Sequence, residues 1–223
     1  MIKKTLIYVL FLNIILVIWC GNIIPLSNQI QPDEKTYQDS IITIYNISKH
    51  YYDSLNMLSA NISDIKKGNI LKHGDTLIIK TDKGFVSFID TLPNRENIES
   101  KIYDYYGYSN LLNSDFVDEI CYESHNYYMI EKNSSRMIKI FYYPILNLSR
   151  KYFFCNFPSV DYSPQSNGIQ IFERKSKDIL LRYEMKFDRF ELINPAWVGD
   201  SIIVTKIRDF AMDTTYCKIR IKF

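Results

Sequence analysis

The chain has 223 residues, with 27 lysines and arginines against 25 aspartates and glutamates, a formal net charge of +2. Phosphate recognition needs clustered basic residues in excess, so this balance gives no electrostatic case for a dedicated nucleic-acid binder. Hydrophobic residues make up 47% of the chain and aromatic residues 15%, which suffices for a buried core and excludes wholesale disorder.

The excess charge lies at the N-terminus. Lys3 and Lys4 are the only charged residues before Asp33, so the chain without its first twenty residues has 25 basic against 25 acidic residues. The run from Thr5 to Trp19 is almost entirely apolar. A short basic segment followed by an apolar run is the layout of a secretory signal peptide, so residues 1–20 are predicted to direct export.

Three fates are open for this segment. Cys20 directly follows the apolar run, as in the lipobox of bacterial lipoproteins, although Trp19 stands where that pattern has a small residue. If the apolar stretch instead continues to Leu26, its roughly 20 residues would form one uncleaved membrane span. The third alternative is cleavage and full release. Two of the three leave the chain tethered to the membrane, so we expect an extracytoplasmic, lipid-anchored or membrane-anchored protein of the bacterial cell envelope or periplasm, with Cys20 as the lipidation candidate.

Residues 21–32 are predicted to be a linker, and residues 33–223 a single β-rich domain with a helical N-terminal part. In the region up to Leu58, apolar residues fall close to the spacing of one helical face: Tyr37, Ile41, Ile44, Tyr51, Leu55 and Leu58. Alternatively, the β-branched stretch from Ser40 to Ile47 forms a strand, and a short helix follows from about Lys49 to Leu58.

The rest of the chain alternates short apolar runs with polar turns. These patterns predict hairpins over residues 76–89, 127–142 and 168–184, and two further strands over residues 201–207 and 216–223. The predicted fold is mainly β (α+β), an antiparallel meander forming a curved sheet, a sandwich or a partial propeller, with a helical N-terminal segment.

One segment, Pro93 to Asn113, is predicted to be irregular and to interrupt the strands. It carries four tyrosines, Tyr103, Tyr105, Tyr106 and Tyr108, around Gly107. A tyrosine has a large apolar ring with a polar tip, so such a cluster can form a binding surface. Alternatively, it is a strand whose alternate tyrosines pack inward, which is unsurprising in a chain with 18 tyrosines.

Several short pieces between Tyr103 and Ile207 are similar in order and style to blade-like strand repeats. These are Tyr105–Tyr108, Tyr127–Arg136, Pro158–Pro164 and Trp197–Ile203. They resemble uncharacterised exported β-rich proteins of Bacteroidetes and, distantly, TolB-type propeller blades. The chain departs from that pattern after Ser163-Pro164, where Gln165-Ser-Asn-Gly168 stands instead of the usual Asp-Gly, and it is too short for a closed propeller of several four-stranded blades. The resemblance implies a β fold and export, and it implies no catalytic residues.

The three cysteines beyond Cys20 are Cys121, Cys155 and Cys217, each in a predicted strand. An odd number leaves at least one thiol unpaired, and a disulfide-stapled domain of this length would carry more pairs. We therefore interpret them as small buried apolar residues rather than a disulfide. No spacing of cysteine and histidine fits zinc, and His50, His73 and His125 form no metal-binding motif, so no metal or other cofactor is predicted.

The densest acidic stretch contains Asp115, Asp118, Glu119 and Glu123. Two carboxylates about 5 to 10 Å apart could hydrolyse glycosidic bonds, but Asp118 and Glu119 are neighbours that would face opposite sides of a strand. A solvated strand edge that discourages aggregation is the simpler interpretation.

Further along the chain, basic and acidic residues alternate in the pattern of cross-strand charge pairs: Arg182, Arg189 and Arg208 with Glu184, Asp188, Glu191 and Asp209. Trp197 follows Asn194-Pro195-Ala196 and is interpreted as a core or rim anchor, with a ligand-stacking role as the alternative.

The conjunction of an export signal, a β meander and no catalytic motif predicts a non-enzymatic recognition module. It would bind a protein or an envelope component through Tyr103, Tyr105, Tyr106 and Tyr108, with Trp197 as a second anchor, and would contact the membrane through its N-terminus. Two other functions stay open. One is a hydrolase of envelope polymers that uses carboxylates such as Asp115 and Glu119. The other is an immunity or inhibitor protein against an exported toxin or a lysozyme-like enzyme.

Overall fold

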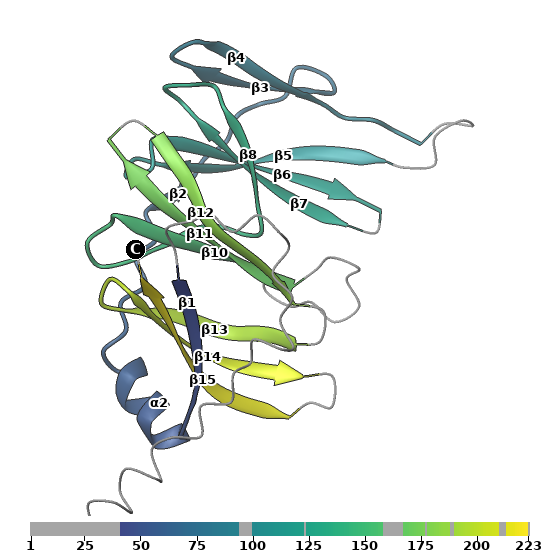
Figure 1. Cartoon of the computed structure of the whole chain (residues 1–223). Helices are drawn as coiled ribbons and strands as arrows, with labels where there is room; N and C mark the ends of the chain where they lie inside the picture. Colours follow the sequence, from purple (N-terminus) through teal and green to yellow (C-terminus); the bar gives the residue numbers. More distant parts are fainter. Residues whose placement is uncertain are drawn as a thin grey trace, which may run out of the picture. The chain divides into compact units, whose positions relative to one another are not determined.

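The computed structural model describes residues 41–93, 100–122, 124–157, 167–176, 178–187, 190–209 and 213–222 (Figure 1). These ranges contain four antiparallel sheets and one short helix, which confirms the mainly β class. Among them, no sheet closes on itself and none forms a propeller, so the partial-propeller alternative is wrong. The described residues include no helix long and apolar enough to cross a membrane. The predicted export segment, including Cys20, and the predicted linker lie outside these ranges.

A five-stranded sheet has the order β2-β5-β6-β7-β8. Its strands are β2 (Ile65–Lys67), β5 (Lys101–Ser109), β6 (Ser114–Cys121), β7 (His125–Glu131) and β8 (Met137–Ile140). A separate hairpin of β3 (Thr76–Thr81) and β4 (Gly84–Ile89) packs on one of its faces. Both predicted hairpins in this region, β3–β4 and β7–β8, are confirmed by their antiparallel pairing. Their turns contain Gly, Asp, Asn and Ser, which favour tight turns.

Two four-stranded sheets follow. The first has the order β12-β11-β10-β9 and comprises β9 (Ile145–Leu146), β10 (Tyr152–Asn156), β11 (Asn167–Lys175) and β12 (Asp178–Phe187). The second has the order β1-β15-β14-β13 and comprises β1 (Ile41–Ile47), β13 (Phe190–Val198), β14 (Ile202–Asp209) and β15 (Thr214–Lys222). The predicted third hairpin and the two C-terminal strands are confirmed, and the C-terminal strand pairs with the first strand described.

From Ile41 to Asn56 the chain forms a strand and a short helix, so the alternative interpretation is confirmed and the long helical face is wrong there, whereas Tyr37 lies outside the described residues. Its β-branched part is β1, and helix α2 (Lys49–Asn56) follows. Ser48 ends the extended run and caps the helix, because its hydroxyl accepts a hydrogen bond from the Tyr51 backbone N–H at 3.2 Å. The helix buries Tyr52 against Ala196 and Val204 of the last sheet.

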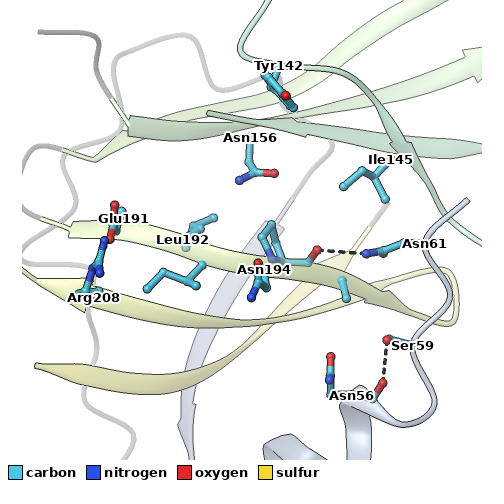
Figure 2. Close-up of a pocket in the computed structure, with 13 residues that line it drawn as sticks. Asn56, Ser59, Asn61, Tyr142, Ile145, Asn156, Glu191, Leu192, Asn194 and Arg208 are labelled. Atoms are coloured by element: carbon cyan, nitrogen blue, oxygen red, sulfur yellow. Dashed lines mark hydrogen bonds and ion pairs between the residues drawn. The ribbon is translucent and has the colours of Figure 1, made fainter. Parts of the chain in front are cut away.

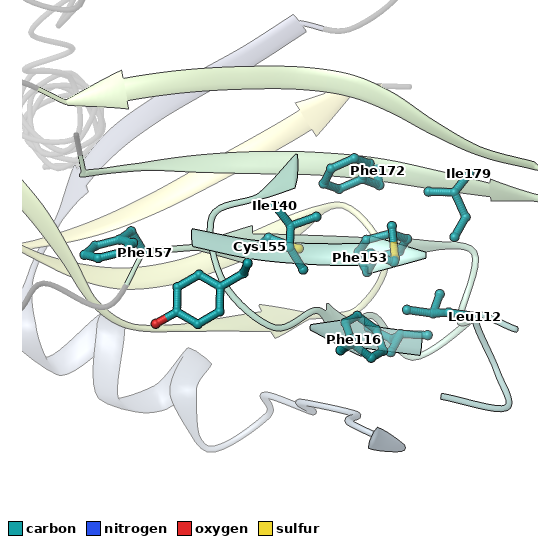
Figure 3. Close-up of a cluster of buried hydrophobic side chains, with 11 residues drawn as sticks. Leu112, Phe116, Ile140, Phe153, Cys155, Phe157, Phe172 and Ile179 are labelled. Carbon is teal, nitrogen blue, oxygen red and sulfur yellow. The ribbon is translucent and has the colours of Figure 1, made fainter. Parts of the chain in front are cut away.

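Both faces of the five-stranded sheet are covered. On one face, Leu77, Ile79 and Phe88 of the β3–β4 hairpin pack against Val117 and Ile130. On the other face, a larger cluster joins this sheet to the β9–β12 sheet (Figure 3). Its buried members are Leu112, Phe116, Tyr127, Met129, Ile140, Leu146, Phe153, Cys155, Phe157, Phe172 and Ile179.

Of the described cysteines, Cys155 and Cys217 are fully buried, and Cys121 is half-buried; all three are unpaired. Burial raises the pKa of the Cys217 thiol to about 12, which keeps it protonated and unreactive. The interpretation as small buried residues therefore holds for Cys155 and Cys217. It fails for Cys121, which lies at the end of β6.

Candidate functional site

Residues 101–109 form a strand, so the irregular segment is wrong there and the alternative, a strand with inward-packing tyrosines, is confirmed for Tyr103 and Tyr105. Strand β5 pairs with β2 on one side and β6 on the other, and a bulge at Tyr106 shifts the register. Tyr103 and Tyr105 pack with the β3–β4 hairpin, whereas Tyr106 packs with the cluster on the opposite face. Gly107, at φ 155°, allows the backbone of the bulge to lie close to β2. A Cβ at this position would lie 2.2 Å from the carbonyl oxygen of Lys66.

The hydroxyl groups of two of these tyrosines satisfy buried carboxylates. The Tyr103 hydroxyl donates to Glu119 at 2.6 Å, and the Tyr105 hydroxyl donates to Asp115 at 2.8 Å. Burial and these hydrogen bonds raise the pKa of both phenols, so both stay protonated. Tyr108 is half-buried on the same face as Tyr105, since its strand partner is Asp115. The predicted tyrosine surface is thus largely occupied by internal contacts.

The acidic stretch is buried rather than solvated. Asp115 is 1% exposed and Glu119 is 5% exposed, so the solvated-edge interpretation is wrong for these two residues, and Glu123 lies outside the described residues. Burial opposes ionisation of Glu119, but hydrogen bonds from Tyr103 and Asn126 lower its pKa overall. Asp115 and Glu119 are four residues apart on one strand, about 13 Å at the usual rise, which exceeds the separation of glycosidase carboxylates.

Asp118 faces the opposite side of the strand from Glu119, as predicted. It accepts a hydrogen bond from the Tyr143 hydroxyl at 2.5 Å and lies 3.5 Å from His125, which stacks on Tyr127. Burial raises the pKa of Asp118, and the Tyr143 hydrogen bond and His125 act against that rise. His125 begins strand β7, and its side chain is 38% exposed. The described residues contain no cluster of three or more histidine, cysteine or carboxylate side chains that could hold a metal ion.

Trp197 is a core residue, with 1% of its surface exposed. Its ring lies 5.5 Å from that of Phe154, and its indole N–H donates to the carbonyl oxygen of Ile145 at 2.8 Å. Trp197 therefore joins the last sheet to the β9–β12 sheet, and its ring offers no accessible stacking face. The predicted pairing of Arg208 with Glu191 is confirmed as a cross-strand ion pair, whereas Asp188 and Arg189 lie outside the described residues.

A pocket of about 510 Å³ opens next to this junction (Figure 2). Strands β13 and β14 line one side, and β9, β10 and Tyr142 line the other. The end of helix α2 and the segment after it contribute Asn56, Ser59 and Asn61. We call it the inter-sheet pocket. Its volume lies within the range of small-molecule sites, roughly 300–1,000 Å³.

A bulge in β13 shapes one wall of the inter-sheet pocket. Residues 194 and 195 have no partner in the register between Ile193 and Ala196, and Asn194 has a left-handed backbone with φ 51°. Proline lacks the N–H that a strand ladder needs, so Pro195 favours such an interruption. The Asn61 side chain fixes the bulge, because it donates to the Pro195 carbonyl at 3.4 Å and accepts from the Trp197 N–H at 3.1 Å.

Asn156, the last residue of β10, points into the inter-sheet pocket (Figure 2). It is only 8% exposed, and its side-chain amide makes no hydrogen bond with any residue in the described part of the chain. Neither polar atom of the Asn156 amide is among the fully buried atoms without a partner, so the amide is reached from the pocket. It can therefore donate to and accept from a group inside the pocket.

Of the lining residues within the described part of the chain, only Glu191 and Arg208 have formal charges. The Arg208 guanidinium donates to the Glu191 carboxylate, whose side chain is 8% exposed. Tyr142, on the opposite wall, packs edge-on against Tyr127 at 4.9 Å between ring centroids. Burial raises the pKa of the Tyr142 phenol, so it is a neutral donor and acceptor at physiological pH.

A second, smaller pocket of about 290 Å³ lies beside Glu131. Unlike Asn156, this buried carboxylate has a full set of partners: it accepts from Arg136 at 2.7 Å, Ser134 at 2.5 Å and the Ile179 backbone N–H at 3.0 Å. Both oxygens of the Glu131 carboxylate already accept hydrogen bonds within the chain, so the inter-sheet pocket is the stronger candidate for a binding site.

Reasoning from the sequence missed the inter-sheet pocket. Its residues come from five separate stretches between Asn56 and Arg208, and asparagines scattered along a chain carry no motif. The one local signal is Asn194-Pro195 inside an apolar run, which indicates a bulge or a strand end. In the structure this dipeptide lies within β13.

No family model matches the chain, and neither a curated protein nor a solved structure is similar to it.

Proposed function

We propose that this chain is a non-enzymatic recognition module of the bacterial cell envelope that binds its ligand in the inter-sheet pocket. The observation that carries the proposal is Asn156, a buried amide without a described partner that faces a cavity of about 510 Å³. An apolar side chain at this position would avoid the cost of burying an amide. A polar group retained against that cost, at the wall of a cavity, is typical of a binding site.

The charges of the pocket favour binding over hydrolysis. Glu191 is the only carboxylate among the described lining residues, and one of its oxygens already accepts from Arg208. Hydrolysis of a glycosidic bond uses two carboxyl groups that flank the bond. Asp115 and Glu119 lie elsewhere, on β6, where tyrosine hydroxyls occupy them.

The tether is the second part of the proposal. The basic and apolar layout of residues 1–20 supports export, and Cys20 supports a lipid anchor. Mass spectrometry of the mature N-terminus distinguishes an acylated Cys20 from an intact N-terminus and from a cleaved, unmodified one. A soluble protein that begins after residue 20 and carries no lipid would refute the tether.

The binding function is tested with the full-length chain in detergent. Envelope extract is separated into saccharide, lipid and protein fractions, and each fraction is tested for its effect on the melting temperature. We expect one fraction to raise the melting temperature of the wild type, because a ligand that binds only the folded state stabilises it. The same fraction should have no effect on Asn156→Leu. If no fraction stabilises the wild type, the proposed function is wrong.

A further inference from the structure

The lining of the inter-sheet pocket is formally neutral. Among the residues that the structure describes around the pocket, Glu191 and Arg208 carry the only formal charges, and they pair with each other. A strongly anionic or cationic ligand would have to compete with that ion pair or lose its hydration without compensation. The pocket is therefore suited to an uncharged ligand.

The polar groups of the pocket are mostly amides. Asn56, Asn61, Asn156 and Asn194 line it together with the hydroxyl of Ser59. An amide side chain offers a carbonyl acceptor and two N–H donors, and a hydroxyl both donates and accepts. Such a lining complements a ligand that carries donors and acceptors of its own in close succession, as hydroxyl and acetamido groups do on a sugar ring.

Apolar surface alternates with these amides. Leu192, Pro195 and Ala196 line the pocket beside the bulge, and the Tyr142 ring lies on the opposite wall (Figure 2). A sugar ring has C–H faces between its hydroxyl groups, so it can pack on an apolar or aromatic surface while its edge forms hydrogen bonds. The pocket offers both kinds of contact within one cavity.

An extended peptide fits the pocket less well. Peptides commonly bind by adding a strand to a sheet edge, and β13 is the edge strand of its sheet. The bulge at Asn194 and the missing N–H of Pro195 interrupt that edge at the pocket. On the opposite side, β9 has only two residues, and the carbonyl of Ile145 already accepts from Trp197. Neither edge presents a continuous hydrogen-bonding ladder.

We infer that the inter-sheet pocket binds a neutral saccharide bearing hydroxyl or acetamido groups, with Asn156 as the buried hydrogen-bonding partner at its floor. This inference rests on the proposed function and names the ligand class of that same site. The outer residues Asn56 and Asn61 would then contact the part of the saccharide nearest to solvent, since both are exposed.

The test uses the full-length chain in detergent with three probes: N,N′-diacetylchitobiose, cellobiose and tetra-alanine. Saturation-transfer NMR and isothermal titration calorimetry report binding at millimolar probe concentration. We expect at least one disaccharide to bind and tetra-alanine not to bind. Asn156→Leu and Asn194→Gly should each weaken saccharide binding at least about tenfold. Glycine tolerates the left-handed backbone at position 194, so the second variant removes an amide without strain. Asn110→Ala, an exposed turn residue outside the pocket lining, serves as the control and should bind like the wild type.

The outcomes separate this inference from the proposed function. Tetra-alanine binding that Asn156→Leu abolishes would refute the saccharide class and leave a recognition module. If neither disaccharide binds while an envelope fraction still stabilises the wild type, the ligand class is wrong and the proposed function survives. If no disaccharide binds and no fraction stabilises the chain, both are wrong. Saccharide binding that persists in both pocket variants would place the site elsewhere and refute the assignment to this pocket.

Discussion

Two buried amides on neighbouring strands, Asn156 and Gln170, are expected to respond in opposite ways to the same substitution. Both are more than nine-tenths buried, at 8% and 4% exposure. The Gln170 amide accepts from the Phe141 N–H at 2.8 Å and donates to Glu184 at 2.8 Å. The Asn156 amide has no such partner in the described part of the chain. Replacing each by leucine therefore removes two hydrogen bonds in one case and none in the other.

The magnitudes follow from the cost of leaving polar groups unpaired. Asn156→Leu relieves the desolvation of an unpaired amide, and water in the pocket already offsets part of that cost, so we expect a gain of about 1 kcal/mol in the free energy of unfolding. Gln170→Leu leaves the Phe141 N–H and the Glu184 carboxylate without this partner, so we expect a loss of about 2 kcal/mol. For a domain of this size, 1 kcal/mol shifts the melting temperature by about 2–4 °C.

The assay is calorimetric or fluorescence-detected melting of the full-length wild type and both variants in the same detergent, without ligand. Asn156→Leu should melt about 2–4 °C above the wild type, and Gln170→Leu should melt about 4–8 °C below it. A fall for Asn156→Leu comparable to that of Gln170→Leu would show that the Asn156 amide has internal partners. That result would remove the observation on which the proposed function rests.

Three further substitutions test the framework around the site. Gly107→Ala should cost about 1–3 kcal/mol in chemical denaturation, because its Cβ would lie 2.2 Å from the Lys66 carbonyl oxygen; an unchanged denaturation midpoint would contradict the bulge geometry. Tyr103→Phe removes a hydrogen bond that lowers the pKa of Glu119. The stability from ionised Glu119 is present above its unfolded pKa of about 4.3 and is lost as the pH falls through the lowered folded pKa. Since the variant raises that folded pKa, acid unfolding monitored by circular dichroism should begin at higher pH, and an unshifted acid transition would refute this role. Trp197→Phe should cost about 2 kcal/mol in thermal melting, because it deletes the hydrogen bond to strand β9, and a neutral effect would contradict that bond as a link between the sheets.

The hairpins were predictable because their information is local. Thr81-Asp-Lys-Gly84 joins two runs of β-forming residues, and nothing beyond about 14 residues is needed to specify that turn. Strand β5 could be predicted only as one of two alternatives, for the opposite reason. Its tyrosines are neither strictly alternating nor continuous around Gly107, because the bulge at Tyr106 changes the face on which side chains point. The segment is recognised as a strand only from its pairing with β2 and β6.

The buried carboxylates and the inter-sheet pocket required long-range information. Asp115 and Glu119 look like a solvated edge when β6 is read alone, and they become core residues because tyrosine hydroxyls on β5 pair with them. Asn156 likewise reads as an ordinary polar residue at a strand end. Its significance depends on β13, some 40 residues later in the sequence, which closes a cavity over its side chain.

The composition suggests recognition by tyrosines, whereas the structure places asparagines at the candidate site. In a chain whose body carries equal numbers of acidic and basic residues, aromatic contact is the expected means of recognition. The hydroxyls of Tyr103 and Tyr105 and the ring of Tyr106 are nevertheless engaged inside the fold. These contacts let the five-stranded sheet bury carboxylates without leaving them unpaired. The Asn156 amide, which makes no hydrogen bond within the described part of the chain, faces a pocket whose two described charges pair with each other. A body without a long-range field and a pocket without net charge both favour a ligand recognised at short range by hydrogen bonds and ring packing, which is how an uncharged saccharide is bound.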